Sequence, residues 1–301
     1  MLALLCLVAV LSFIIISTVG VAQQHGGQQQ ARVGMIRARQ LAEMGVAVAA
    51  HPQIKAGDPL LRRSVSAVEH YETRISTEEA RLNLNALLTE AGLPVLERVF
   101  AYWGLLPADA QSLAATLMDW VDPDDLKRRP DSAEKLDYDF AGLKGIPLNR
   151  PFQSLDEVDL VPRMMEITEL RPDWRSFFTL RGSGMLDVNT ASAEVLAAVT
   201  GASLSNAEEL VRRRNGLDEI AQTEDDLPVQ SVEEALALLG VGGGNVQEAA
   251  AVLTLAGQTK RIESVGMAGD VRCGLAVILN GGAAGIAEWK EFSLEDGPAG
   301  L

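Results

Sequence analysis

Acidic side chains crowd one stretch of the chain, and the chemistry open to them is the binding of a hard cation. Residues 119–139 read DWVDPDDLKRRPDSAEKLDYD, and the prolines at positions 123 and 130 indicate a loop. The acidic residues are Asp119, Asp122, Asp124, Asp125, Asp131, Glu134, Asp137 and Asp139. Calcium binds about six to eight oxygen ligands, often from flexible loops, so this stretch is the best candidate for a metal site.

The spacing of these residues does not match an EF-hand. An EF-hand that began at Asp122 would need glycine at its sixth position, where the chain has Lys127. The alternative is a solvated acidic loop whose charge is partly neutralised by Lys127, Arg128 and Arg129. The residues alone favour the solvated loop over the metal site.

Catalytic motifs are missing from the sequence. The three histidines, His25, His51 and His70, have no HExxH or CxxC context, and neither GxSxG nor GxxxxGK[ST] occurs. The glycine run 240–244 follows a predicted helix over 232–239, so it is expected to end that helix rather than to hold a phosphate. We therefore expect no enzyme activity and no small-molecule substrate.

Residues 186–215 have the pattern of a helix-hairpin-helix, a motif that can bind DNA phosphates through backbone amides at helix N-termini. The first helix is expected to start at Asn189 or Thr190, and the second at Ser205 or Asn206. The turn between them is expected at Thr200-Gly201. The hairpin has Ser203-Leu204 in place of the usual second glycine, and the chain carries a net charge of −15. Phosphate binding needs an excess of Lys and Arg, so we expect no nucleic-acid partner. The one basic run, 212–214, is expected to be a solvated helix end.

The N-terminus predicts a membrane anchor. Residues 1–22 contain no charge, and the first charged side chain is Arg32. As a helix, this segment would be roughly 33 Å long, enough to cross a hydrocarbon core of about 30 Å. It lacks the basic start of a secretory signal. The helical pattern resumes over 31–50 and ends at His51-Pro52.

The remaining pattern predicts an α+β fold. A strand is expected over 66–79, and three short strands, 261–267, 272–279 and 285–292, are expected to form an antiparallel sheet near the end of the chain. The expected organisation is 1–31 for the anchor and start of a long helix, 32–80 for helix and first strand, 81–256 for an inserted all-helical domain, and 257–301 for the last strands.

The insert contains a diverged internal repeat. The first copy has RLNLN at 81–85 and FQSLDE at 152–157, and the second has LDVNT at 186–190 and VQSVEE at 229–234. In both copies a serine, Ser154 or Ser231, is followed three residues later by Glu157 or Glu234, which predicts a capping box at the start of a helix. The repeat therefore predicts two related helical halves.

These features together resemble the K-type minor pseudopilins of the type II secretion system. The resemblance rests on the apolar N-terminus and on residues 39–45, 77–85, 118–124, 132–134, 138, 152–158 and 186–191. It implies a long N-terminal transmembrane helix packed on a small antiparallel pilin-like sheet, with a SAM-like, helix-hairpin-helix-like insert. It further implies a place at the pseudopilus tip with the I- and J-type minor pseudopilins, and a part in protein export across the outer membrane. The chain would be single-pass in the inner membrane, with its globular part in the periplasm.

The resemblance also changes the balance for the acidic stretch. Members of this family bind calcium near the motif that matches 119–124, and the matching positions imply Asp122, Asp124, Glu134 and Asp137 as ligands. Ser132 stands where the family has glycine. Prepilins have a short basic leader, whereas this chain begins inside the apolar segment. Leu5 stands where ordinary pilins have an acidic residue, and the K-type family also lacks this acid. Two other functions stay open: a membrane-anchored helix-hairpin-helix DNA receptor, and a calcium-dependent interaction module on a membrane stalk.

Overall fold

The computed structural model describes residues 29–243, 245–279 and 285–292. The expected membrane anchor, residues 1–22, lies outside the described residues. Among the described residues, no helix has the length and apolar character needed to cross a bilayer. The chain divides into two compact units. The sheet unit contains the N-terminal helix and the main sheet, and the insert consists of Ser76–Arg261 together with the short Leu279–Gly285.

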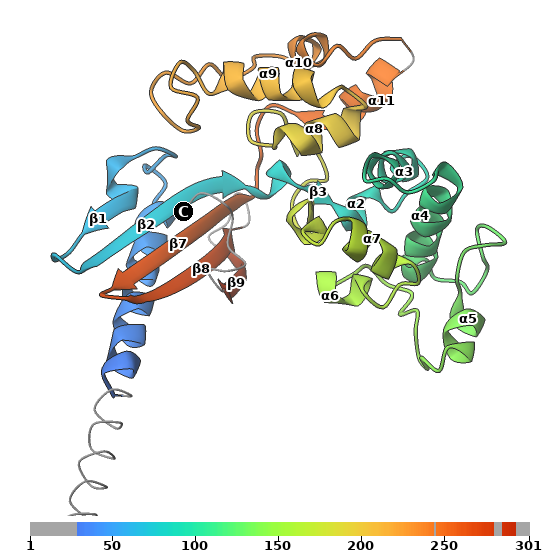
Figure 1. Ribbon diagram of the computed structural model, residues 1–301, viewed down its shortest axis with the longest axis horizontal. Helices are drawn as coiled ribbons and strands as arrows, with labels where there is room; N and C mark the ends of the chain where they lie inside the picture. Colours follow the sequence, from blue (N-terminus) through green and yellow to red (C-terminus); the bar gives the residue numbers. More distant parts are fainter. Residues whose placement is uncertain (1–28, 244, 280–284, 293–301) are drawn as a thin grey trace, which may run out of the picture. The chain divides into compact units, whose positions relative to one another are not determined.

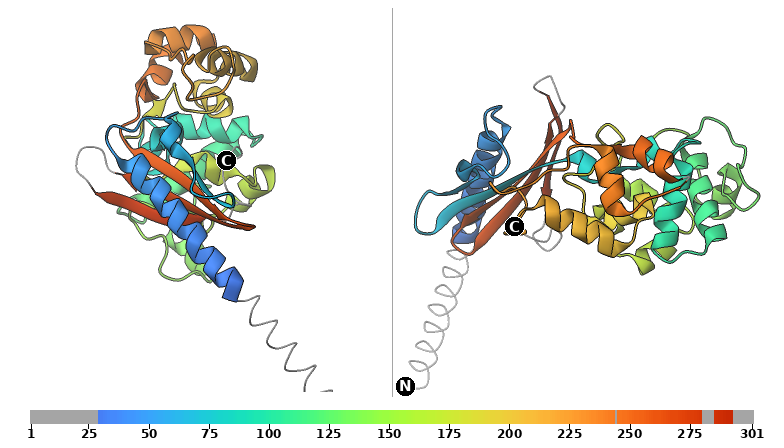
Figure 2. Two further views of the ribbon diagram at one scale, coloured as in Figure 1. Left: turned by 90° about the vertical axis from the view of Figure 1, so that its left-hand side faces the viewer. Right: turned by 90° about the horizontal axis from the view of Figure 1, so that it is seen from above.

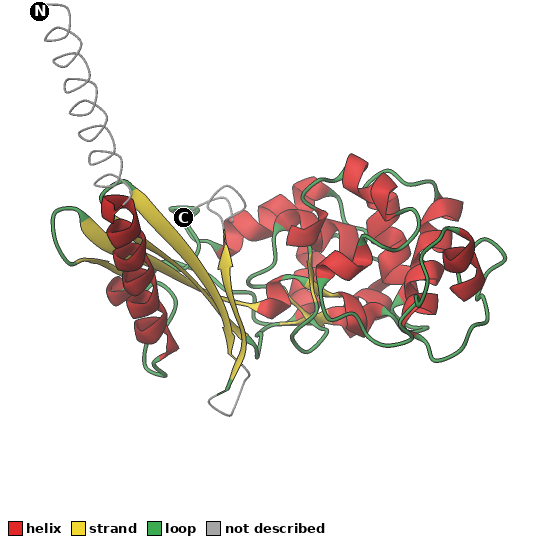
Figure 3. Cartoon of the chain, turned by 90° about the horizontal axis from the view of Figure 1, so that it is seen from below, coloured by secondary structure: helices red, strands yellow, loops and turns green. Residues whose placement is uncertain are grey.

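The sheet unit is a five-stranded sheet with one helix across one face (Figures 1, 2 and 3). The strand order is β1-β2-β7-β8-β9. The strands are β1 (Arg62–Ser64), β2 (Glu69–Thr77), β7 (Lys260–Ala268), β8 (Val271–Leu279) and β9 (Ile286–Phe292), preceded by the short η1 (Pro59–Leu61). β1 and β2 are antiparallel, with Ser64 opposite His70. The helix over 29–50 and all four expected strands are confirmed.

Small residues allow the helix to approach the sheet closely. The buried side of the helix consists of Ala38, Leu41, Ala42, Val46 and Ala49, which recur at helical spacing. A Cβ at Gly266 of β7 would collide with the helix backbone at Ala38 and Ala42. A Cβ at Gly45 would collide with the hydroxyls of Thr73 and Ser264, which are themselves hydrogen-bonded at 2.8 Å. Glycine at both contact points therefore sets the distance between the two layers.

The insert is built from two groups of helices, green and yellow to orange in Figure 1. The first half contains α2 (Leu84–Leu87), α3 (Leu93–Tyr102), α4 (Pro107–Val121), α5 (Lys135–Phe140), α6 (Leu155–Val158), α7 (Met164–Leu170) and η3 (Trp174–Ser176). The second half contains α8 (Ala193–Thr200), α9 (Leu204–Arg214), α10 (Val232–Leu239) and α11 (Asn245–Val252). Gly240 ends α10 in the left-handed conformation with φ 69°, as expected from the glycine run.

The expectation that the insert is all-helical is wrong in one respect. Each half also contains a two-stranded parallel ladder, which pairs β3 (Leu82–Asn83) with β4 (Phe178–Thr179) and β5 (Leu186–Asp187) with β6 (Leu253–Thr254). Strands of two residues are too short to show an alternating pattern, because one apolar and one polar position fit any element. In each ladder, two residues of the asparagine motif of that half, RLNLN at 81–85 or LDVNT at 186–190, pair with the end of the same half.

Aromatic side chains fill the core of the first half. Trp120 is fully buried, stacks on Phe152 at 5.6 Å and meets the ring of Tyr138 edge-on, also at 5.6 Å. Trp103 packs edge-on against Phe177 at 5.1 Å. Since Trp120 and Tyr138 are the second and the second-last residues of the acidic stretch, this packing fixes both of its ends.

The insert begins and ends about five residues outside the boundaries expected from sequence. The observed insert runs from Ser76 to Arg261, whereas the expected insert was 81–256. Two buried carboxylates explain the difference. Both belong to the short helix η2 (Glu78–Ala80). Glu78 forms an ion pair with Arg261 at 2.9 Å, and Glu79 accepts hydrogen bonds from the backbone N–H groups of Ser183 and Thr259. These bonds attach both connecting segments to the insert.

Candidate metal centre

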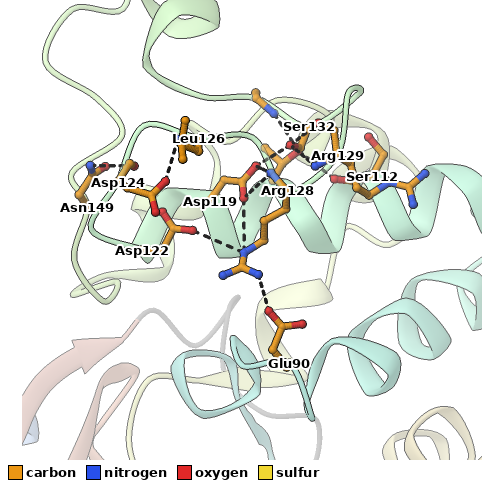
Figure 4. Close-up of polar contacts among 12 residues, drawn as sticks. Glu90, Ser112, Asp119, Asp122, Asp124, Leu126, Arg128, Arg129, Ser132 and Asn149 are labelled. Atoms are coloured by element: carbon orange, nitrogen blue, oxygen red, sulfur yellow. Dashed lines mark hydrogen bonds and ion pairs between the residues drawn. The ribbon is translucent and has the colours of Figure 1, made fainter.

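Asp119 organises the acidic loop from within. It lies in the last turn of α4 and is fully buried. Its carboxylate accepts a hydrogen bond from the Ser132 hydroxyl and two from the backbone N–H of Arg128, each at 3.3 Å (Figure 4). Burial raises the pKa of Asp119, although the bonds from Ser132 and Arg128 oppose this rise. Asp119 therefore folds the loop back onto α4.

Between α4 and α6, three buried carboxylate or amide oxygens have no hydrogen-bond partner among the described residues, and neither does the buried hydroxyl of Tyr138. The three oxygens are Oδ1 of Asp122, Oε1 of Glu134 and Oδ1 of Asn149. The amide nitrogen of Asn149 donates to the backbone carbonyl of Asp124 at 3.3 Å, which places the side chain beside the start of the loop (Figure 4). Buried polar atoms are normally paired, so oxygens of this kind indicate bound water or a cation.

The electrostatic environment of Glu134 is unfavourable for a carboxylate without a cation. Glu134 is 2% exposed. Burial, followed by the negative charges of Asp119, Asp122 and Asp125, raises its pKa to about 7. Burial and the charges of Asp119 and Asp124 also raise the pKa of Asp122, although Arg128, 3.4 Å from its second oxygen, opposes this rise. A positive ion in this position would offset both the burial and the mutual repulsion.

The other two expected ligands are engaged elsewhere. Asp124 is exposed and accepts a hydrogen bond from the Leu126 N–H at 2.8 Å. Asp137 forms a capping box with Glu134 at the start of α5 and an ion pair with Lys127 at 2.8 Å. Burial alone would raise the pKa of Asp137, but the hydrogen bonds from the Glu134 N–H and from Lys127 lower it. Within the described part of the chain, no three acidic, histidine or cysteine side chains are grouped closely enough to hold a metal together.

The donor set is suited to calcium rather than to a softer metal. Asp122, Glu134 and Asn149 supply carboxylate and amide oxygens, and calcium completes its shell with backbone carbonyls and water. Asn149 was missed in the sequence because a lone asparagine carries no metal signal. Its left-handed backbone, with φ 47°, is typical of asparagine but indicates only a turn.

Two asparagines make equivalent hydrogen bonds, or clamps, at matching places in the two halves of the predicted repeat. Asn85 donates to the carbonyl of Phe152 at 2.9 Å and accepts from the Phe152 N–H at 2.9 Å. Asn189 makes the same two bonds to Val229, at 3.1 and 2.8 Å. Each clamp therefore fixes the residue that precedes the Gln-Ser motif of its own half.

The serines after these clamps start helices as expected, with one difference. Ser154 caps α6 and Ser231 caps α10. In a capping box, the acid three residues later accepts from the backbone N–H of the cap residue. Here it accepts from the residue before the cap: Glu157 from the Gln153 N–H at 3.3 Å, and Glu234 from the Gln230 N–H at 3.0 Å. The expected capping box is thus widened by one residue.

The helix-hairpin-helix is present as α8 and α9, but two details of the prediction are wrong. The caps are Ser192 and Ser203, since residues 188–190 form a turn before α8 begins. Arg214 is buried rather than solvated, and it donates to the carbonyls of Val188 and Ala191. Arg212 pairs with Glu209, and Arg213 lies 3.5 Å from Glu234. The whole basic run is thus engaged within the insert.

Comparisons with known proteins agree with this architecture. Two family models, both described as type II secretion system (T2SS) protein K, match residues 80–172 and 186–256, one for each half of the insert. The crystal structure of the GspK-GspI-GspJ complex from enterotoxigenic Escherichia coli contains a chain with the same fold. The two are 14% identical with a TM-score of 0.60, and the match covers 90% of this chain and 99% of that chain. No curated protein matches the sequence. The matches to both halves of the insert place the chain in the protein K family of the type II secretion system.

Proposed function

We propose that the protein is a minor pseudopilin that acts at the tip of the type II secretion pseudopilus and takes part in protein export across the outer membrane. The observation that carries this proposal is the family match over both halves of the insert. The sheet unit adds a helix on a five-stranded sheet, the arrangement expected of a pilin-like core (Figure 1). In this role the protein is an assembly subunit without catalytic activity.

The insert supports a position at the end of a fibre. Residues 76–261 contain 31 acidic and 17 basic residues, whereas the rest of the chain contains 10 and 9. Neighbouring copies along a fibre would bring these large, like-charged inserts close together, which is unfavourable. A single copy at the tip avoids this repulsion.

The proposed partners are the I- and J-type minor pseudopilins, because the structurally similar chain is part of a GspK-GspI-GspJ complex. Co-expression of the full chain with the I- and J-type proteins of its own secretion system tests this assignment. We expect the three proteins to co-purify in equal amounts and to be required for secretion. Recovery of this chain without either partner, together with unchanged secretion in its absence, would contradict the proposal.

The insert can be removed cleanly for a second test. The Glu78 N–H donates to the Thr259 carbonyl at 2.9 Å, and a Cβ on Gly257 would touch Thr77, so the two ends of the insert lie side by side. Joining Thr77 directly to Gly257 should leave the sheet unit intact. We expect this shortened chain to form homotypic fibres that the full chain does not form. If fibre formation does not improve, the insert is not what prevents polymerisation.

The proposed localisation is the inner membrane, with residues 1–22 as the anchor and both units in the periplasm. The support is the uncharged run of residues 1–22. Membrane fractionation with carbonate washing, and protease protection in spheroplasts, test the anchor and its orientation.

We also propose a structural calcium ion in the loop between α4 and α6, held by Asp122 and Glu134. The unpaired buried oxygens of these residues and of Asn149 support this site. Bound calcium would neutralise the carboxylates and link the segments that carry them. Asp124 and Asp137, the other two expected ligands, would join only if they gave up their bonds to Leu126 and Lys127.

A further inference from the structure

The short helix α5 has one face in the core and the other in solvent. Tyr138 is buried, with its ring against Trp120. Leu136 and Phe140, two residues to either side of Tyr138, are 70% and 90% exposed. Residues four apart share a helix face, whereas residues two apart do not. The burial of Tyr138 therefore directs both apolar side chains outward.

A third exposed apolar side chain, Leu126, is carried by the loop that precedes α5. Two ion pairs link this loop to α5: Lys127 with Asp137 at 2.8 Å and Lys135 with Asp125 at 3.6 Å. Leu126 lies between Asp125 and Lys127, the two loop residues of these pairs. Leu126 is 74% exposed. We call Leu126, Leu136 and Phe140 the α5 surface.

The charge around the α5 surface is negative. Residues 119–139 contain eight acidic and four basic residues. The basic side chains, Lys127, Arg128, Arg129 and Lys135, are all in ion pairs with acids of the insert. The remaining negative charge repels a second copy of this acidic chain and an anionic bilayer, and it attracts Lys and Arg.

We propose that the α5 surface is a docking site for a segment of another protein in which large apolar side chains alternate with Lys or Arg. Clustered exposed apolar side chains on a soluble domain commonly mark an interaction site. Phe140 supplies an aromatic anchor of the kind that dominates interfaces, and the carboxylates around it pair with the cations of the partner. The α5 surface does not overlap the unpaired oxygens of the metal centre, so this site is separate from the proposed calcium ion.

The test uses the full chain in nanodiscs of zwitterionic lipid, with calcium present and with empty nanodiscs as the blank. The probe is a fluorescein-labelled amphipathic peptide of Leu and Lys, followed by fluorescence anisotropy, and its counterpart has Glu in place of Lys. We expect the Leu/Lys peptide to bind and the Leu/Glu peptide not to bind. The double variant Leu136→Ser/Phe140→Ser should weaken binding at least tenfold. Leu217→Ser is the matched control, because Leu217 is 96% exposed in another acidic loop of the insert.

Equal affinities of the double variant and the wild type would overturn the proposal, as would equal binding of the two peptides. The proposal also fails if the double variant loses self-association in sedimentation, or binding to anionic vesicles, but keeps its affinity for the peptide. Because the altered side chains are exposed, the variants should melt like the wild type. If the double variant melts at a lower temperature than the wild type, Leu126→Ser provides a second test. Co-purification with I- and J-type pseudopilins should be unchanged, which separates this result from the proposed tip function.

Discussion

Asn85 and Asn189 make the same pair of hydrogen bonds, each to the backbone of one residue in its own half of the insert. Asn85 holds Phe152 and Asn189 holds Val229, with all four distances between 2.8 and 3.1 Å. A side-chain amide has one donor side and one acceptor side, so it can pair with a backbone group as a neighbouring strand would. In both halves, this clamp closes the long connection between a helical hairpin and the next capped helix.

Substitution of either clamp should destabilise the insert. Asn85→Ala or Asn189→Ala leaves a backbone N–H and a carbonyl without their partners, which costs about 2–4 kcal/mol. Urea unfolding followed by tryptophan fluorescence measures this loss. Asn215→Ala is the matched control, because the amide of Asn215 makes one exposed bond, to the carbonyl of Glu219 at 3.3 Å, and its loss should change stability by less than about 0.5 kcal/mol. Equal effects at all three positions would contradict the role of the clamps.

The sequence was sufficient to predict the repeat but not the strands that complete it. The asparagine motifs and the two Gln-Ser motifs occur in the same order in both halves, and each residue type has a local role that can be recognised. The ladders β3–β4 and β5–β6 contain two residues per strand, and their pairing depends on segments far apart in sequence. The fold class, the long helix and the sheet strands were predictable because their patterns extend over many residues.

Calcium should stabilise the insert through Asp122 and Glu134. Binding to the native state alone raises the free energy of unfolding by about 2.7 kcal/mol at a hundredfold excess over Kd. We expect the thermal midpoint of the full chain to rise on calcium addition. Asp122→Ala should abolish this rise, and Asn149→Ala should weaken it. Asp131→Asn is the matched control in the same acidic stretch, because Asp131 is exposed and paired with Arg129. An unchanged midpoint at millimolar calcium, or equal responses of Asp131→Asn and Asp122→Ala, would contradict the metal site.

Without calcium, stability should fall as the pH rises. Burial raises the pKa of Glu134 from 4.5 to about 7, so between these values the folded chain binds more protons than the unfolded chain. The free energy of unfolding therefore decreases through this window, by up to about 3 kcal/mol from this group. Glu134→Gln should remove this part of the slope, and calcium should reduce it in the wild type. Urea unfolding in metal-free buffer across the window measures both effects. A slope that Glu134→Gln leaves unchanged would show that another group is responsible.

The details of the metal centre could not be predicted because they depend on tertiary contacts. Spacing along the chain identified the acidic stretch, but it could not show that Asp119 is bonded to Ser132 and Arg128. Nor could it show that Asp137 is engaged by Lys127, or that Asn149 returns to the loop from beyond α5. Which carboxylates are available to a cation is decided by these competing partners.

Arg214 should matter for stability far more than the two arginines before it. It is 7% exposed, its guanidinium donates to the carbonyls of Val188 and Ala191, and burial lowers its pKa to about 10. Arg214→Ala leaves both carbonyls without these donors and opens a cavity, which should cost about 2–4 kcal/mol. Arg212→Ala removes an exposed ion pair with Glu209 and should change stability by less than about 1 kcal/mol. Arg214→Lys separates charge from geometry, because an ammonium cannot reproduce the forked arrangement of donors, and it should recover only part of the loss. Urea unfolding of the three variants provides the comparison, and full stability of Arg214→Ala would contradict the structural role of this side chain.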